Sequence, residues 1–209
     1  MKSIAIFVEG GGATRRDGQD RLRQGFDALL DNQKLAARRK SLRWQLGLYG
    51  SRNEAFKAFR DATTKKQVDL AVLLVDAEEP VSDNTPSGRL AHLKARDGWD
   101  FEGVDPSRVH LMTQCMEAWI VADPDKLEEF YGQGFKKNAL PKRQVLDEEP
   151  KANLHSSLDA ATKGTKKGNY GKITHASEIL KRLRTSVVTT RCTSFQQLTQ
   201  WLDASIGRV

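Results

Sequence analysis

The chain has 209 residues and a formal net charge of +7, a length that suits one α/β domain with an additional segment or two small domains. Its two cysteines, Cys115 and Cys192, lie far apart, which argues against a disulfide framework and against a cysteine-based zinc site. No apolar stretch suits a signal peptide or a membrane span, so we expect a cytoplasmic protein. The basic excess suits a nucleic-acid partner, and an ordinary soluble surface explains it equally well.

The first 80 residues alternate between strand and helix patterns. Residues 4–8 and 70–75 are unbroken apolar runs, typical of strands that are buried on both faces of a parallel sheet. Residues 43–49, which lie between these two runs in the sequence, alternate in polarity and predict another strand. An apolar stripe from Leu22 to Leu30 predicts a long helix after the first strand, and the capping box of Ser51–Glu54 opens another. This β-α-β-α-β order predicts a parallel sheet with right-handed crossovers.

The next expected elements are a loop over residues 79–86, a helix over 87–96 and a fourth strand over 109–112. Asp123 followed by Pro124 is typical of a helix start. Aspartate caps the first turn there, and proline needs no backbone donor at the first helical position. The middle of the chain therefore continues the α/β pattern.

The last third of the chain has a different composition. From about residue 135 to 172 apolar residues become rare and lysines and glycines accumulate, so we predict a partly irregular basic region. A strand over 187–190 and a final helix capped by Ser194 complete the prediction. We therefore divide the chain into an α/β core, residues 1–125, and a basic, mainly helical extension, residues 126–209, that packs on the core.

Carboxylates follow two of the expected strands at the point where each strand ends. Glu9 comes directly after the first apolar run, and Asp76 and Glu78 follow the third strand. Ligands of open α/β sheets bind at the carboxyl ends of the strands, so we expect these three acids to meet there. In an extended segment residues i and i+2 point the same way, which places Asp76 beside Glu78. Because clustered carboxylates repel one another and Mg²⁺ prefers oxygen ligands, the sequence predicts a divalent metal site.

The turn between the first strand and its helix is rich in glycine and arginine. Glycine lets the backbone approach a ligand closely, and the start of a helix favours a phosphate. The residues expected to contact phosphate here are Gly10, Gly11, Gly12, Arg15 and Arg16. The spacing matches neither GxGxxG nor a P-loop, so a plain tight turn stays open as the alternative.

Two of these segments resemble a known domain. Glu9-Gly10 after the first strand, with Asp76-Ala77-Glu78 after a later one, resembles the toprim domain of topoisomerases, primases and overcoming-lysogenization-defect nucleases, with Glu78 where that pattern has a second aspartate. The similarity extends to residues 114–119, 130–135 and 167–176. Together the segments resemble a bacterial toprim-like family of uncharacterised function, some members of which are similar to the effector subunit of PARIS-type anti-phage defence systems.

The resemblance implies a metal-dependent nuclease that uses Mg²⁺ or Mn²⁺. Glu9 is then a general acid or base or a metal ligand, and Lys172 stabilises charge on the scissile phosphate. The implied metal ligands besides Glu9 are Asp76, Glu78 and Glu117. A carboxylate favoured at the start of a helix explains Glu117 equally well, and a solvated lysine explains Lys172.

Further contacts with nucleic acid are expected along the basic region. Lys166 and Lys167 carry charge suited to a phosphate backbone, and Tyr170 is expected to stack on a base. His175 is included with them, although a packing or capping role near the start of a helix explains it as well. Solvated surface lysines are the alternative for the whole region.

We consequently expect a metal-dependent nuclease acting on DNA or on RNA such as tRNA. The resemblance places it in anti-phage defence, beside an ABC-type ATPase. A non-catalytic subunit that binds nucleic acid or the ATPase on the same scaffold is the alternative. A small-molecule phosphate enzyme that uses the glycine-rich turn is a third hypothesis. Whether the chain forms a homo-oligomer stays open.

Overall fold

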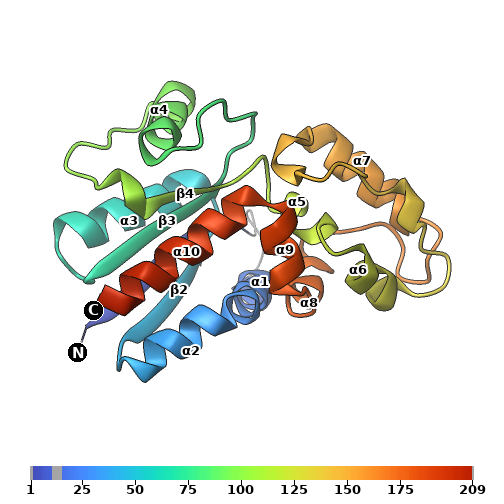
Figure 1. Cartoon of the computed structure of the whole chain (residues 1–209), viewed down its shortest axis with the longest axis horizontal. Helices are drawn as coiled ribbons and strands as arrows, with labels where there is room; N and C mark the ends of the chain where they lie inside the picture. Colours follow the sequence, from blue (N-terminus) through green and yellow to red (C-terminus); the bar gives the residue numbers. More distant parts are fainter. Residues whose placement is uncertain (1, 11–15, 209) are drawn as a thin grey trace.

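A computed structural model gives the fold of this chain and describes residues 2–10 and 16–208. Within these residues, parallel strands form a sheet in the order β2-β1-β3-β4 (Figure 1). The strands are β1 (Ser3–Glu9), β2 (Arg43–Tyr49), β3 (Leu70–Asp76) and β4 (Val109–Met112). The predicted α/β fold with a parallel sheet is confirmed.

Helices cover both faces of the sheet, because successive side chains of a strand point to opposite sides. One layer consists of α3 (Arg52–Thr64) and α4 (Pro86–Asp97), and the other contains α1 (Arg16–Leu29), α2 (Asp31–Arg39) and α10 (Thr193–Arg208). Phe7 and Leu73 pack in the core under the first layer, and Ile6 and Val72 pack under the second. Both faces of β1 and β3 are thus buried, as their unbroken apolar runs predict.

The remaining α-helices lie between β4 and α10 in the chain (Figure 1). They are α5 (Glu117–Val121), α6 (Pro124–Tyr131), α7 (Lys151–Thr162), α8 (Ala176–Leu180) and α9 (Thr185–Arg191), with short 3-10 helices η1 (Pro106–Arg108), η2 (Lys137–Ala139) and η3 (Leu146–Glu148). None of the helices between residues 16 and 208 combines the length and the apolar character that a membrane span needs.

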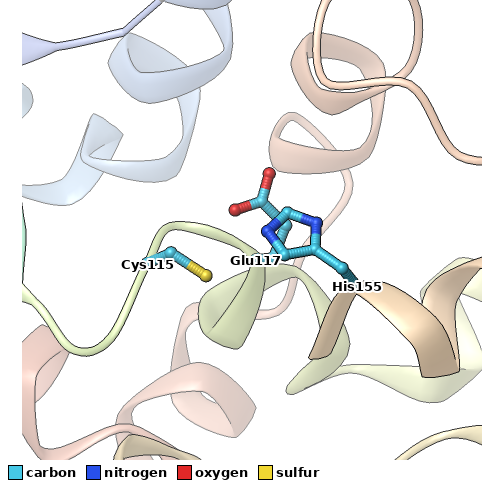
Figure 2. A group of neighbouring side chains, drawn as sticks. All are labelled: Cys115, Glu117 and His155. Atoms are coloured by element: carbon cyan, nitrogen blue, oxygen red, sulfur yellow. The ribbon is translucent and has the colours of Figure 1, made fainter. Parts of the chain in front are cut away.

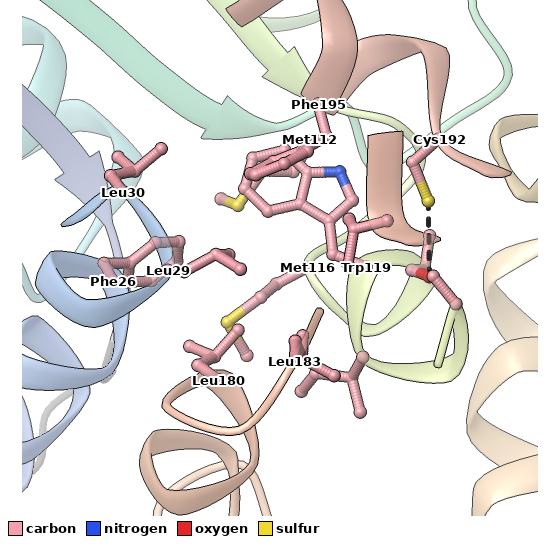
Figure 3. Packing of buried hydrophobic residues seen from close by; sticks show 14 of the residues in the cluster. Phe26, Leu29, Leu30, Met112, Met116, Trp119, Leu180, Leu183, Cys192 and Phe195 are labelled. Carbon is pink, nitrogen blue, oxygen red and sulfur yellow. Dashed lines mark hydrogen bonds between the residues drawn. The ribbon is translucent and has the colours of Figure 1, made fainter. Parts of the chain in front are cut away.

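Trp119 packs at the centre of the larger apolar cluster (Figure 3). Its ring centroid lies 6.4 Å from that of Phe26 and 5.0 Å from that of Phe195, and its Nε1 donates to Ser194 Oγ over 3.2 Å. Buried Leu154 of α7 joins the same cluster. The basic region is therefore less irregular than expected, because α7 lies within it and contributes to the core. The division of the chain near residue 125 stays a prediction.

The predicted strand over residues 187–190 is wrong, because α9 covers them. Four consecutive β-branched residues favour a strand by local propensity, but a strand also needs a neighbour to pair with. In the helix Val188 is buried, and Thr190 Oγ1 donates to the carbonyl oxygen of Ser186 over 2.9 Å. Packing of one face thus overrides the local preference.

Asp147, rather than Ser194, satisfies the start of α10. The helix begins at Thr193, and Asp147 accepts from Ser194 N over 2.7 Å and from Ser194 Oγ over 2.9 Å. We expect Asp147→Ala to lower the free energy of unfolding by about 2 kcal/mol, because buried donors of the first turn lose their acceptor. Urea unfolding measures this. Asp159→Ala on the exposed side of α7 is the control, and an equal loss in both variants would contradict the capping role.

His110 of β4 is expected to make stability depend on pH. It is buried, and its Nε2 has no hydrogen-bond partner among the described residues. Burial, and then the guanidinium of Arg89, lower the pKa of His110 from its usual 6.5 to about 3. Below pH 6.5 the unfolded chain therefore binds a proton that the folded chain does not, and this contribution to stability is lost as the pH falls.

The expected loss of unfolding free energy from this histidine is about 2 kcal/mol between pH 7 and pH 5. Urea unfolding of the wild type and of His110→Phe at both pH values isolates it, since every other titrating group is shared. The variant should lose less stability on acidification than the wild type. An identical pH dependence in the two proteins would show that His110 is not the group responsible.

Candidate metal centre

The acids that follow β1 and β3 lie together at the carboxyl end of the sheet. Carboxylate oxygens of Glu9, Asp76 and Glu78 all lie within 4.8 Å of one another. The two strands are parallel neighbours with Val8 opposite Leu74, so their ends reach the same place. The order of the strands thus brings together the side chains that the sequence singles out, and their roles stay predictions.

Backbone groups hold Asp76 in place. Its side chain is almost fully buried, and Met116 N donates to Asp76 Oδ1 over 2.9 Å. Lys172 Nζ lies 3.3 Å from the other oxygen, Oδ2. The backbone N of Asp76 also donates to Glu9 Oε2 over 3.3 Å. The two carboxylates are therefore oriented by the strand ends on which they stand.

Glu78 reaches the other acids through a turn. Its φ of 67° is in the left-handed region, which is uncommon for a residue with a side chain. Its backbone N donates to the carbonyl oxygen of Gln114 over 2.7 Å, which holds the turn against the segment after β4. The expected extended geometry is therefore wrong, because β3 ends at Asp76. Such backbone strain is frequent at functional sites.

Each acid has a basic side chain beside it. The pairs are Arg52 with Glu9, Lys172 with Asp76 and Lys151 with Glu78. The first pair is the loosest, with Arg52 Nη1 3.8 Å from Glu9 Oε2. Sequence reasoning missed Arg52 and Lys151 as members of this site. The need of clustered carboxylates for positive charge was the available signal, but it does not say which of many basic residues supply that charge.

The pKa shifts reflect crowded negative charge. Burial, and then repulsion from Asp76, raise the pKa of Glu9 to about 7. Burial also raises the pKa of Asp76, against the opposing charge of Lys172. For Lys172 burial acts downward, but the carboxylates of Asp76 and Glu117 outweigh it, so its pKa is raised and the ammonium is charged at neutral pH. A divalent cation would stabilise the ionised form of these acids.

Glu117 belongs to a separate group with Cys115 and His155 (Figure 2). One donor atom of each of these residues lies within 4.8 Å of the others, and Glu117 is buried. Tyr170 donates its hydroxyl to Glu117 Oε1 over 3.1 Å. Thiol and imidazole are ligands that Zn²⁺ accepts, whereas Mg²⁺ takes oxygen ligands. Glu117, the predicted fourth Mg²⁺ ligand, therefore lies beside the three acids but groups with a thiol and an imidazole, which are donors of different chemistry.

His175 orders the turn that carries Lys172. Gly171 N donates to His175 Nδ1 over 3.2 Å, and the Tyr131 hydroxyl lies 3.1 Å from the same nitrogen. Because an amide N–H can only donate, Nδ1 is an acceptor and the ring proton is on Nε2. These contacts of His175 are made within the fold, as the packing or capping alternative predicts.

The other residues expected to contact nucleic acid are spread around this turn. Lys166 and Lys167 are exposed in the loop between α7 and α8, with Lys167 Nζ 5.0 Å from the ring centroid of Phe130. The ring of Tyr170 packs against the core while its hydroxyl points to Glu117, which limits stacking on a base. The two lysines are therefore the more accessible of these residues.

The described part of the glycine-rich turn has a packing explanation. Gly10 is buried, and a Cβ added there would lie 2.7 Å from Leu48 Cδ1 of β2. Gly10 N donates to the carbonyl oxygen of Tyr49 over 3.0 Å. The other residues expected to contact phosphate here lie outside the described part of the chain: Gly11, Gly12, Arg15 and the side chain of Arg16.

A family model described as "Domain of unknown function (DUF4276)" matches residues 18–203. This chain belongs to the DUF4276 family. The matched residues include Asp76, Glu78 and Lys172, whereas Glu9 precedes them. No curated protein and no solved structure matches the chain. A function for this DUF4276 protein therefore has to be argued from its own side chains.

The acid group of the DUF4276 protein fits a hard divalent cation. Glu9, Asp76 and Glu78 supply oxygen donors within 4.8 Å of one another, the donor type that Mg²⁺ and Mn²⁺ bind. Lys151 and Lys172 lie against two of these carboxylates, so a cation would compete with two ammonium groups there. Binding would thus leave lysine charge available to an anion at the same place.

Proposed function

We propose that this protein is a metal-dependent phosphodiesterase that cuts nucleic acid. The proposal rests on one arrangement: three carboxylates with oxygens within 4.8 Å of one another, and Lys172 Nζ 3.3 Å from Asp76 Oδ2. Phosphodiester hydrolysis needs positive charge on the phosphate and a group that accepts a proton from water. A divalent cation held by these acids, together with Lys172, meets the first need, and a carboxylate meets the second.

Each residue then has a defined role. Asp76 and Glu78 would hold Mg²⁺ or Mn²⁺, which would supply Lewis-acid stabilisation of the phosphate. Glu9 accepts the proton of the attacking water while the bond from phosphorus to the leaving oxygen breaks. Lys172 stays protonated and stabilises the negative charge that develops on a non-bridging phosphate oxygen.

Nucleic acid is the favoured substrate class because of the charge of the chain. The formal net charge is +7, and Lys166 and Lys167 are exposed in the loop that also carries Lys172. Such lysines bind the phosphate backbone with little readout of sequence. The sequence resemblance to PARIS-type effectors adds tRNA as a substrate to test, a role in anti-phage defence and an ABC-type ATPase as a partner.

The test is cleavage of labelled tRNA and of single-stranded and duplex DNA and RNA with Mg²⁺ or Mn²⁺. We expect the wild type to cut a substrate only when metal is present, and Glu9→Gln to cut it at least about 100-fold more slowly. Glu102→Gln, which changes an exposed carboxylate outside the acid group, is the matched control and should keep full activity. Wild-type cutting by Glu9→Gln would remove Glu9 from the mechanism.

A non-catalytic binding subunit is the second candidate. Arg52, Lys151 and Lys172 already place positive charge beside the acids, so the group is neutralised in part without metal. This candidate is expected to bind nucleic acid equally well as wild type and as Glu9→Gln, with no cutting by either. Repeating the assay with an added ABC-type ATPase partner separates it from a nuclease that only the partner activates.

A further inference from the structure

A cavity of about 540 Å³ lies at the outer edge of β4, away from the metal centre. α4 and α10 both pack against this edge strand (Figure 1). They line the cavity together with the loop that precedes α4. None of the three acids of the metal centre lines the cavity. Its volume is in the range of small-molecule binding sites.

Arg89 of α4 brings a buried positive charge to this cavity. Arg89 is only 4% exposed. Its Nε donates to the carbonyl oxygen of Val109 over 2.7 Å, and its Nη1 donates to the carbonyl oxygen of Asn84 over 2.8 Å and to Gln197 Oε1 over 3.0 Å. These neutral acceptors orient the guanidinium but do not neutralise it.

The charge of Arg89 has no close counter-ion in residues 2–10 and 16–208, since no carboxylate there lies within the 4.0 Å that defines an ion pair. Asp83, which also lines the cavity, acts on Arg89 from a greater distance. A buried charge is costly unless an opposite charge accompanies it. An anion that enters the cavity would supply such a charge.

His110 is an independent sign of a ligand. It lines the same cavity and is 2% exposed, and its Nε2 finds no partner among the described residues. Buried polar atoms in folded proteins almost always have a partner, so an unpaired one beside a cavity leaves a place where a ligand group can pair. The ring of Trp201 lies beside His110, with centroids 5.6 Å apart.

We propose that this cavity binds a phosphate-bearing small molecule of nucleotide size. The phosphate pairs with Arg89, close to the start of α4, where the helix dipole also favours an anion. The base of the nucleotide lies near the ring of Trp201, and the side-chain amides of Gln197 and Gln200 meet the polar edge of the base. This site is separate from the metal centre and does not depend on the proposed nuclease activity.

Isothermal titration calorimetry and thermal unfolding of the full chain test the site. The probes are the four nucleoside 5′-monophosphates, inorganic phosphate and adenosine. We expect at least one nucleotide to bind at a single site and to raise the unfolding temperature until saturation. Phosphate and adenosine are each expected to bind at least about tenfold more weakly. No binding at millimolar concentration, or phosphate binding as tightly as every nucleotide, overturns the proposal.

Variants locate the bound nucleotide. Gln200 is exposed, so Gln200→Glu adds a repelling carboxylate at the cavity without disturbing the core, and should weaken binding at least about tenfold. Thr193→Glu makes a similar charge change at an exposed position two turns away on α10 and should bind as the wild type does. Unchanged binding by Gln200→Glu overturns the proposal.

Two further variants complete the test. Arg89→Gln should also lose binding; if it does not fold, Gln200→Glu decides. Glu9→Gln should bind nucleotide as the wild type does, whether or not it cleaves nucleic acid. Loss of binding in Glu9→Gln assigns the nucleotide to the metal centre and overturns the proposal.

Discussion

Lys172→Gln is expected to slow metal-dependent cleavage by about 100- to 1,000-fold. Lys172 Nζ lies 3.3 Å from Asp76 Oδ2, and a third of the side chain is exposed, so it borders the acid group and can reach a substrate. Its raised pKa keeps the ammonium charged at neutral pH. Glutamine has similar length and polarity but no charge, so the variant removes the ammonium from the substrate phosphate and from Asp76.

Metal binding separates this role from a structural one. The glutamine variant no longer places an ammonium on Asp76, so it should bind Mg²⁺ at least as tightly as the wild type, as measured by calorimetry. Lys57→Gln, on an exposed lysine of α3 outside the acid group and outside the loop of Lys166 and Lys167, is the matched control and should cut at close to the wild-type rate. Weaker metal binding by Lys172→Gln would mean that the lysine organises the acids instead of the substrate.

The sequence predicts the scaffold of this site well because the relevant signals are local. Unbroken apolar runs identify β1 and β3, and the acid after each run follows from one stretch of chain. The capping box is equally local, and Ser51 Oγ does accept from Glu54 N, over 3.3 Å. Since parallel neighbours end at the same edge of a sheet, the meeting of Glu9 with Asp76 follows from strand order alone.

The partners of the acids could not be predicted in the same way. Lys151 pairs with Glu78 across 73 positions, and Lys172 pairs with Asp76 across 96. Such pairs depend on how the helices after β4 pack on the sheet, which no local pattern determines. The same reason explains why Asp147, 47 positions away, takes the capping role expected of Ser194. Long-range packing therefore completes a site that local patterns begin.

Arg52→Met is expected to lower the free energy of unfolding by about 3 kcal/mol, measured by urea denaturation. Arg52 Nη2 donates to Asp97 Oδ2 over 2.8 Å, and both side chains are largely buried. Arg52 Nη1 donates to the carbonyl oxygen of Asp76 over 3.1 Å, which ties α3 to the end of β3. Methionine keeps much of the contact with Trp99 but leaves the buried Asp97 carboxylate with Arg96 as its remaining basic partner.

Arg60→Met is the matched control, because Arg60 stands on the same helix and pairs with the exposed carboxylate of Asp100. Solvent screens that pair, so its loss should change stability far less. Adding Asp97→Asn to Arg52→Met removes the carboxylate that has lost one of its two basic partners and should restore part of the lost stability. No recovery would assign the loss to packing on Trp99 instead. Because Arg52 Nη1 also lies 3.8 Å from Glu9 Oε2, removing its charge should strengthen Mg²⁺ binding, which links this support of the fold to the metal centre.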